Sequence, residues 1–308
     1  MNNSFLLHAH AEEGGGFMEE LLREVLLHGF IDTLKLLPFL FLTYLLMEFI
    51  EHRAADRAES FMKRAGKVAP LIGGAVGAVP QCGFSAAASN LFAGRVITVG
   101  TLVAVFLSTS DEMLPILISG SVPIWAVLLI LLYKAAVAIL AGFAVDLVAR
   151  RLKRVDEINI DEICDNDNCH CERGILYSAI HHTLTISLFV LVCTLAINAL
   201  VFFVGEERLG SIMYGAPFVS HLIAALFGLI PNCAASVALT TLCTEGLITV
   251  GTMLAGLFSG AGTGLLVLFR INKHPKENLV ILAILVLVGT LFGLVGDLIV
   301  PSSLFSAG

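Results

Sequence analysis

A polar stretch inside an apolar segment is the part of this sequence best suited to chemistry. Residues 108–115 read STSDEMLP, which places two adjacent carboxylates and three hydroxyls just before a proline. An ionisable residue at membrane depth is costly and indicates a functional site by default. Neighbouring helical residues point about 100° apart, so we expect one carboxylate to face the site. The alternative is that both acids lie at the outer interface, since they come late in the apolar run.

The rest of the candidate site consists of small polar residues. The second-half segment equivalent to 108–115 is rich in glycine, reads SGAGTG at 259–264, and contains no acid. Two proline-containing interruptions, PQC at 80–82 and PNC at 231–233, add amides and thiols. Oxygen ligands suit hard cations such as Mn²⁺, whereas thiolates suit softer metals. The candidate ligands are Asp111, Glu112, Ser108, Ser110, Gln81, Cys82, Ser85, Asn232, Cys233, Ser236, Ser259 and Thr263.

Two further features could take part in metal or proton chemistry. Lys134 lies near the middle of the apolar run 122–149, too deep for its side chain to reach water. We expect it to pair with Asp111 or Glu112, or to exchange a proton with them. The central loop reads CDNDNCHC at 164–171, a high density of metal ligands contributed by Cys164, Cys169, His170 and Cys171. The alternative for the loop is an acidic linker that binds metal adventitiously.

The composition indicates a membrane protein. Hydrophobic residues make up 57% of the 308 residues and charged residues 14%, against roughly 45–50% and 25% in soluble proteins. The apolar runs reach about twenty residues, the length of a spanning helix, and in lipid a helix satisfies its own backbone. No basic patch interleaved with aromatic residues suggests nucleic acid, and no Walker A motif suggests ATP hydrolysis.

The chain contains an internal repeat with an offset of 151 residues. Segments 77–117 and 228–268 align without a gap and share 15 identities, including the PQC/PNC pair and ITVGT in both halves. The predicted organisation is therefore a sequence of four parts. These are an N-terminal segment with an amphipathic helix (1–30), membrane repeat 1 (31–149), a cytoplasmic loop (150–174) and membrane repeat 2 (175–308).

Basic residues predict the topology. They crowd the segments 53–67, 150–154 and 270–276, and basic loops stay in the cytoplasm. All three can lie inside only if the interrupted segments 68–93 and 215–244 enter and leave on the same side, as re-entrant hairpins. The alternative is that proline and glycine merely kink a span.

The predicted fold is an all-α polytopic membrane protein with two inverted repeats. Each repeat has three spanning helices and a re-entrant helical hairpin, which gives ten apolar helices in all. Inverted repeats with broken helices that meet near the midplane are typical of secondary transporters.

Three long stretches carry a family resemblance. They are IDTLKLLPFLFLTYLLMEFIEH (31–52), GAVPQCGFSAAASNLFAGRVITVGTLVAVFLSTSDEMLPIL (77–117) and GLIPNCAASVALTTLCTEGLITVGT (228–252). Together they resemble the bacterial ten-helix heavy-metal exporters, a family whose members are labelled arsenic efflux protein or manganese transporter. The resemblance covers about 28–300 and implies export across the inner membrane. The loop 164–171 also resembles the variable metal-ligand loop of that family. Since the labels disagree, the resemblance leaves the ion open.

The leading hypothesis is a secondary transporter that exports a divalent heavy metal, manganese first among them, by alternating access with protons as coupling ion. The expected partners are the metal substrate and membrane lipid. We expect no nucleic acid partner, no cofactor and no catalytic activity. The oligomeric state is left open, with a homodimer as one alternative. One alternative is a carrier for an arsenical or another anionic or organic solute. A second is a membrane enzyme with Cys82 or Cys233 as nucleophile and His181 or His182 as base, and a third is a channel.

Overall fold

The protein is a helical bundle over the residues described by the computed structural model. These are 68–78, 82–109, 113–119, 122–151, 175–204, 217–231 and 233–300, with scattered positions between 30 and 45, and they contain no strand. In chain order the helices are α4 (Ala69–Gly77), α5 (Cys82–Ala93), α6 (Val99–Ser108), α7 (Met113–Ser119), α8 (Ile124–Arg151), α10 (Ile175–Val204), α12 (Pro217–Gly228), α13 (Cys233–Thr244), α14 (Val250–Ser259), α15 (Thr263–Ile271) and α16 (Pro275–Ile299).

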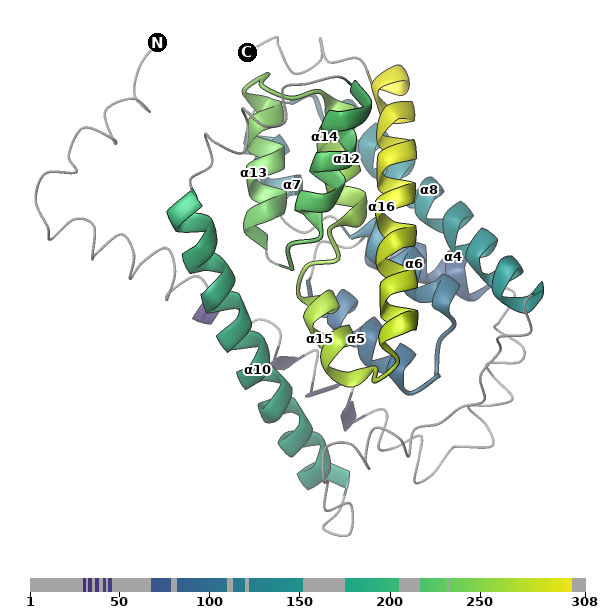
Figure 1. The fold of residues 1–308 in the computed structure, drawn as a ribbon, viewed down its shortest axis with the longest axis vertical. Helices are drawn as coiled ribbons and strands as arrows, with labels where there is room; N and C mark the ends of the chain where they lie inside the picture. The colour runs from purple at the N-terminus through teal and green to yellow at the C-terminus, as the bar shows by residue number, and fades with distance from the viewer. Residues whose placement is uncertain are drawn as a thin grey trace, which may run out of the picture.

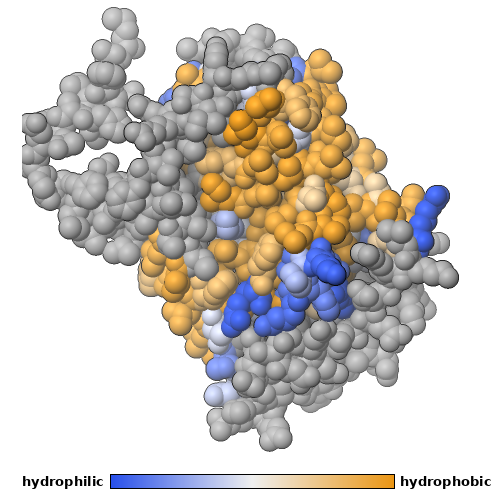
Figure 2. Space-filling view, in the orientation of Figure 1, coloured by the Kyte–Doolittle hydropathy of each residue, from blue (hydrophilic) through white to orange (hydrophobic). Residues whose placement is uncertain are grey.

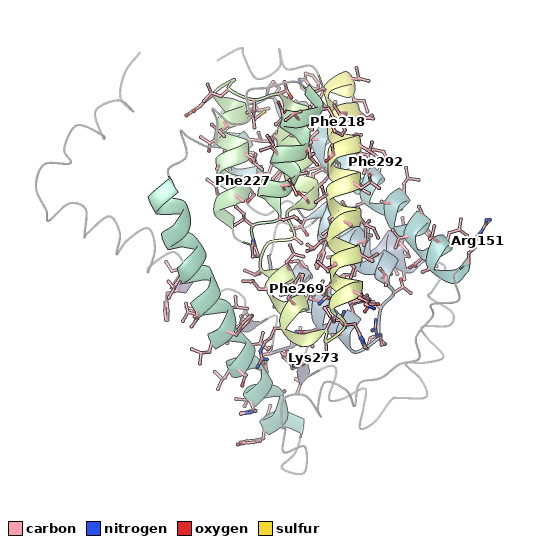
Figure 3. All side chains as sticks on the ribbon, viewed as in Figure 1. Arg151, Phe218, Phe227, Phe269, Lys273 and Phe292 are labelled. Atoms are coloured by element: carbon pink, nitrogen blue, oxygen red, sulfur yellow. The ribbon has the colours of Figure 1, made fainter. Side chains whose placement is uncertain are left out.

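Figure 1 shows how the ends of the bundle differ. Helices α12, α13 and α14 gather toward one end, whereas α5 and α15 lie toward the other. The long helix α16 runs past both groups. Figure 3 marks the two ends with Phe218, at the start of α12, and Lys273, just before α16. The positions of the other helices can therefore be described by the part of α16 that they lie beside.

The helix boundaries recur at the interval of the sequence repeat. Helices α13 and α14 begin and end 151 positions after α5 and α6. Helix α16 likewise begins 151 positions after α8. The two halves thus share not only motifs but also the places where helices start and stop.

One set of hydrogen bonds fixes the start of α6 in the first half and of α14 in the second half. In the first half, Asp146 of α8 accepts from Gly100 N at 2.9 Å and from Thr98 Oγ1 at 2.8 Å, while Thr98 Oγ1 caps Thr101 N at 3.2 Å. A threonine at this position caps a helix by accepting one of its unpaired N–H groups. The carboxylate fixes the capping threonine, so α8 determines where α6 begins.

The second half repeats this cap with the equivalent residues. Asp297 of α16 accepts from Gly251 N at 2.6 Å and from Thr249 Oγ1 at 3.0 Å. Thr249 Oγ1 accepts from Thr252 N at 3.1 Å. We call the two arrangements the aspartate caps; one ties α6 to α8 and the other ties α14 to α16.

Glycines bring these helices into backbone contact. A Cβ on Gly100 would overlap Gly142 O and the Asp146 carboxylate, and one on Gly251 would overlap Gly293 O and Asp297. Small residues at such crossings are typical of helix packing in membranes, where close van der Waals contact replaces the hydrophobic driving force.

Among the described residues, three segments are long and apolar enough to cross a membrane. They are 124–151, 275–299 and the pair α14–α15 at 250–271. A third of the most apolar window is buried in each of the first two, against 78% in the pair, so α8 and α16 face outward and α14–α15 forms the centre. Figure 2 shows a broad hydrophobic surface over the side where α16 lies, bordered by a hydrophilic band toward the Lys273 end. This distribution matches a belt of lipid contact.

Most of the predicted spans coincide with helices. The apolar runs of the sequence predict spans at 122–149, 177–204 and 278–300, and these correspond to α8, α10 and α16. Those at 96–118 and 246–269 are each interrupted, between α6 and α7 and between α14 and α15, where the polar and glycine-rich stretches lie. The central loop, most of the amphipathic helix predicted at 17–35 and most of the first span fall outside the described residues.

Candidate functional site

The second-half break, between α14 and α15, is described completely. Ala261 N, which a continued helix would direct at Leu257 O, donates instead to Ser259 O at 3.1 Å. Gly262 then takes a positive φ of 53°, a conformation that glycine adopts without steric cost, and α15 begins at Thr263. Leu257 O therefore leaves the backbone ladder and becomes an acceptor for another group.

Lys134 supplies that group. Its Nζ donates to Leu257 O at 3.2 Å and to Thr109 O at 2.5 Å, at the end of α6. The side chain is fully buried, and its ammonium also lies 5.8 Å from the centre of the Phe258 ring. Helix C-termini carry partial negative charge, which favours a cation there. One ammonium thus joins the broken ends of two helices that come from different halves.

The predicted ligands Ser108 and Ser259 already have hydrogen-bond partners. Ser108 Oγ donates to Ala104 O or Val105 O of its own helix, at 2.8 and 3.0 Å. Ser259 Oγ donates to Ala225 O of α12 at 2.6 Å or to Gly256 O at 2.9 Å. Their hydroxyl protons are therefore used to close the last turn and to hold the neighbouring helix.

Thr263 differs from these serines. Its side chain is 3% exposed, and its Oγ1 has no hydrogen-bond partner in the part of the chain that the structure describes. A buried hydroxyl without a partner loses the hydrogen bonds that it made to water. Among the predicted ligands with described side chains, Thr263 is the one in this state, and it begins α15 at the centre of the bundle. That makes it a position where a ligand would be accommodated.

Helix α5 brings a second predicted ligand to the same break. Ser89 Oγ donates to Gly264 O at 2.7 Å or to Ser85 O at 2.9 Å, and a Cβ on Gly264 would overlap Ser85. Ser85, on α5 of the first half, therefore lies beside the start of α15 of the second half. Helix α13 makes the equivalent contact with α7. It carries Ser236, which is half-buried and whose carbonyl accepts from Thr240 Oγ1 at 2.7 Å.

Several predicted ligands cannot be placed. Ser110, Asp111, Glu112, Gln81 and Asn232 lie outside the described residues, as do the loop residues Cys164, Cys169, His170 and Cys171. Cys82 and Cys233 begin α5 and α13, but only their backbones are described. Within the described ranges, no three His, Cys, Asp or Glu residues come close enough to hold a metal ion. The donors that can be seen at the centre are hydroxyl and carbonyl oxygens.

The sequence reasoning missed three polar contacts. Two are the aspartate caps. The signal that could have revealed them is an aspartate that recurs at the 151-residue offset of the repeat. The third joins the α5–α6 turn to α16: Arg95 forms a two-pronged ion pair with Glu277, at 2.9 and 3.0 Å. His221 of α12 adds an ion-pair contact of 3.0 Å with Asp297 in the second half only. These contacts lie at the ends of the helices and position the centre.

Comparison with known proteins gives one match. A family model described as "Putative, 10TM heavy-metal exporter" matches residues 171–306, and its description agrees with the family that the sequence motifs resemble. The match covers the second half, so the resemblance of residues 28–170 rests on their motifs. No curated protein and no solved structure matches the chain. The apolar helices and this match together support a multi-pass membrane protein.

Proposed function

We propose that this protein is a secondary transporter that exports a divalent heavy-metal ion, with manganese as the first candidate, across the bacterial inner membrane. The observation that carries the proposal is the meeting of two broken helices at one buried point. Thr109 O of α6 and Leu257 O of α14 lie within 3.2 Å of the same Lys134 nitrogen. Broken helices of this kind, held inside a bundle, form the ion and substrate sites of many transporters.

The repeat indicates which acid completes the site. At the offset of 151, Glu112 stands at the position of Thr263, and Asp111 at the position of Gly262. Thr263 is the buried residue without a partner, whereas Gly262 forms the turn. We therefore assign Glu112 as the charged ligand, and Asp111, at the position of Gly262 just before α15, as the less important of the two acids.

The positions of the hairpins support an inverted arrangement. Pro70, near the start of α4, lies where a Cβ on Gly142 of α8 would touch it, and α5 ends in the turn that reaches Glu277. Both ends of the α4–α5 hairpin are thus near the C-terminus of α8 and the N-terminus of α16. His221 of α12 and Gly251, near the start of α14 and just beyond the α12–α13 hairpin, both contact Asp297.

The hairpins therefore open at opposite ends of the bundle. Glu277 and Asp297 are 20 residues apart on α16, which corresponds to about 30 Å of helix, the thickness of the hydrocarbon core. The first hairpin opens toward the end of α8 that carries Arg150 and Arg151, the cytoplasmic side by the positive-inside rule. This arrangement would let either hairpin expose the central site to one side at a time.

The oxygen-rich donors favour a hard cation. Hydroxyls, carbonyls and a carboxylate suit Mn²⁺ better than the soft metals that thiolates bind. Protons are the proposed coupling ion, since Glu112 can carry one in the absence of metal. The cysteine-rich loop 164–171 would bind the metal on the cytoplasmic side before transport.

The test is metal uptake by inside-out vesicles. We expect the wild type to accumulate Mn²⁺ and Glu112→Gln to abolish the uptake. Asp111→Asn should lower it less, and Thr263→Val should lower it about tenfold or more, the effect of losing one oxygen ligand worth about 1.4 kcal/mol. Thr240→Val is the matched control, because it removes a buried hydroxyl that donates to its own helix. Mn²⁺ uptake by Glu112→Gln equal to that of the wild type would refute the site.

A second candidate function rests on Lys134. A fully buried ammonium at the centre is also the feature expected of a carrier for an arsenical or another anion, which would bind beside it together with the N-termini of α5 and α13. Vesicles that accumulate arsenite but not Mn²⁺, Zn²⁺ or Cd²⁺ would establish this function. In that case Lys134→Met should abolish the uptake.

A further inference from the structure

The ammonium of Lys134 occupies the place of a metal ion. Two of its acceptors are carbonyl oxygens at the ends of α6 and α14, the groups that coordinate cations in broken-helix transporters. We name the two carbonyls of Thr109 and Leu257 the carbonyl cradle. A cation needs the oxygen lone pairs that the ammonium already takes, and two positive charges at contact distance repel strongly in a low-dielectric interior.

We propose that Lys134 is a tethered competitor of the transported cation: it fills the carbonyl cradle when the carrier is empty and leaves it when cargo binds. This inference rests on the proposed function and adds to it a residue that limits affinity. The lysine stem allows such a movement, since its charge is a point at the end of four flexible carbons. The helix itself can stay in place.

The neighbouring residue shows that the helix is held independently of Lys134. Tyr133 OH donates to Phe292 O of α16 at 2.5 Å, and the Tyr133 ring packs edge-on against Phe258 at 5.9 Å. Helix α8 therefore keeps its contact with α16 whether or not the ammonium is in the cradle. Displacing Lys134 would release the link between the end of α6 and the end of α14.

That link explains how occupancy would be sensed by both halves. Helix α6 belongs to the first half and α14 to the second, so the empty carrier is held by an ammonium that bridges them. A cation in the cradle replaces the bridge and frees the lysine. A tight site without a competitor would bind the metal but release it slowly, and Lys134 promotes release by returning to the carbonyls.

The test compares equilibrium Mn²⁺ binding in the purified full-length protein, with transport measured in parallel. Lys134→Met keeps the length of the side chain without its charge, and Lys134→Gln keeps a donor for the carbonyls without the charge. Both should bind Mn²⁺ at least tenfold more tightly than the wild type and transport it more slowly. Lys134→Arg should retain the affinity of the wild type. Tyr133→Phe, one residue away on the same helix, should also leave binding unchanged.

Thermal unfolding provides a readout that does not depend on transport. Lys134→Met should lower the melting temperature in the absence of metal, because the cradle loses its donor. Saturating Mn²⁺ should raise that temperature more in the variant than in the wild type, because the metal binds the folded state more tightly.

Two results would overturn the inference, and they are distinguishable. Wild-type binding that Lys134→Met and Lys134→Gln weaken or leave unchanged would show that the lysine only holds the helices together. No binding of Mn²⁺, Zn²⁺ or Cd²⁺ by the wild type or any variant would overturn the proposed function as well.

Discussion

The segments 69–151 and 217–299 share the boundaries of α5 with α13 and of α6 with α14, and they have the same aspartate caps, but they carry different charges. Where the first segment has Lys134 and Arg95, the second has Leu285 and Gly246, and Pro70 of the first is replaced by His221. The shared features fix where helices start, cross and break. The different ones lie at the centre and at the mouths of the hairpins. The comparison teaches that one scaffold is used twice, whereas the charges that would select and release cargo are supplied by one half only.

The aspartate caps give the largest expected effect on stability. We expect Asp146→Ala and Asp297→Ala each to lower the free energy of unfolding by about 3–6 kcal/mol, since each removes two hydrogen bonds to a charged acceptor, worth ~1.5–3 kcal/mol apiece. Melting of the detergent-solubilised protein, followed by size-exclusion chromatography after heating, measures the loss. Asp→Asn at either position should retain most of the stability. A loss confined to one half would break the comparison.

His221 makes the second-half cap different, and a double-mutant cycle tests the difference. His221→Phe combined with Asp297→Ala should show a coupling of about 1–2 kcal/mol, because the two side chains are in contact at 3.0 Å. The matched cycle, Pro70→Ala with Asp146→Ala, should be additive within about 0.5 kcal/mol. Equal coupling in both cycles would mean that the histidine adds nothing specific to the second half.

Substitutions of Arg95 have the smallest expected effect on stability, and the prediction concerns which of two variants is more stable. Its φ of 56° is a conformation that favours glycine, and the equivalent Gly246 has a φ of 76°. Both Arg95→Gly and Arg95→Ala lose the ion pair with Glu277, but Arg95→Gly also relieves the backbone. We expect the glycine variant to be more stable than the alanine variant by about 0.5–1 kcal/mol, the reverse of the usual order.

The control for this prediction is Gly246→Ala. An added Cβ there would have no atom within 4 Å, so only the backbone conformation changes in energy. It should lower stability by about 1 kcal/mol. Thermal melting of the three variants side by side measures the order, and an alanine variant more stable than the glycine variant at position 95 would contradict it.

The fold was predictable where the pattern was strong and local. Hydropathy located α8, α10 and α16, and the two copies of ITVGT located the start of α6 and of α14. The breaks could be predicted at 259–264 because glycine removes the preference for a helix. What hydropathy cannot show is which helix of one half packs on which helix of the other, since the contact between α5 and α15 joins residues 175 positions apart.

The residue types at the site could be predicted from the sequence, but the hydrogen bonds that each residue makes could not. Ser108, Ser259 and Thr263 look alike in sequence as small hydroxyls beside a break. Their roles separate only when neighbouring carbonyls are placed, because two of the three hydroxyls find an acceptor within 3 Å and the third does not. Lys134 was recognised as unusual, but its carbonyl partners could not be, since every residue has a carbonyl and the sequence does not say which one leaves the helix ladder.

The ion pair between Arg95 and Glu277 has a consequence for how the protein is made. Its two residues are separated by 182 positions in the chain, which a ribosome translates in roughly 10–40 s at ~5–20 residues per second. During that time the first hairpin has entered the membrane without the partner of its arginine. The last helix, α16, brings that partner and also Asp297, the anchor of the second hairpin. Nascent chains that stop before residue 275 should therefore retain chaperone contacts that full-length chains have released.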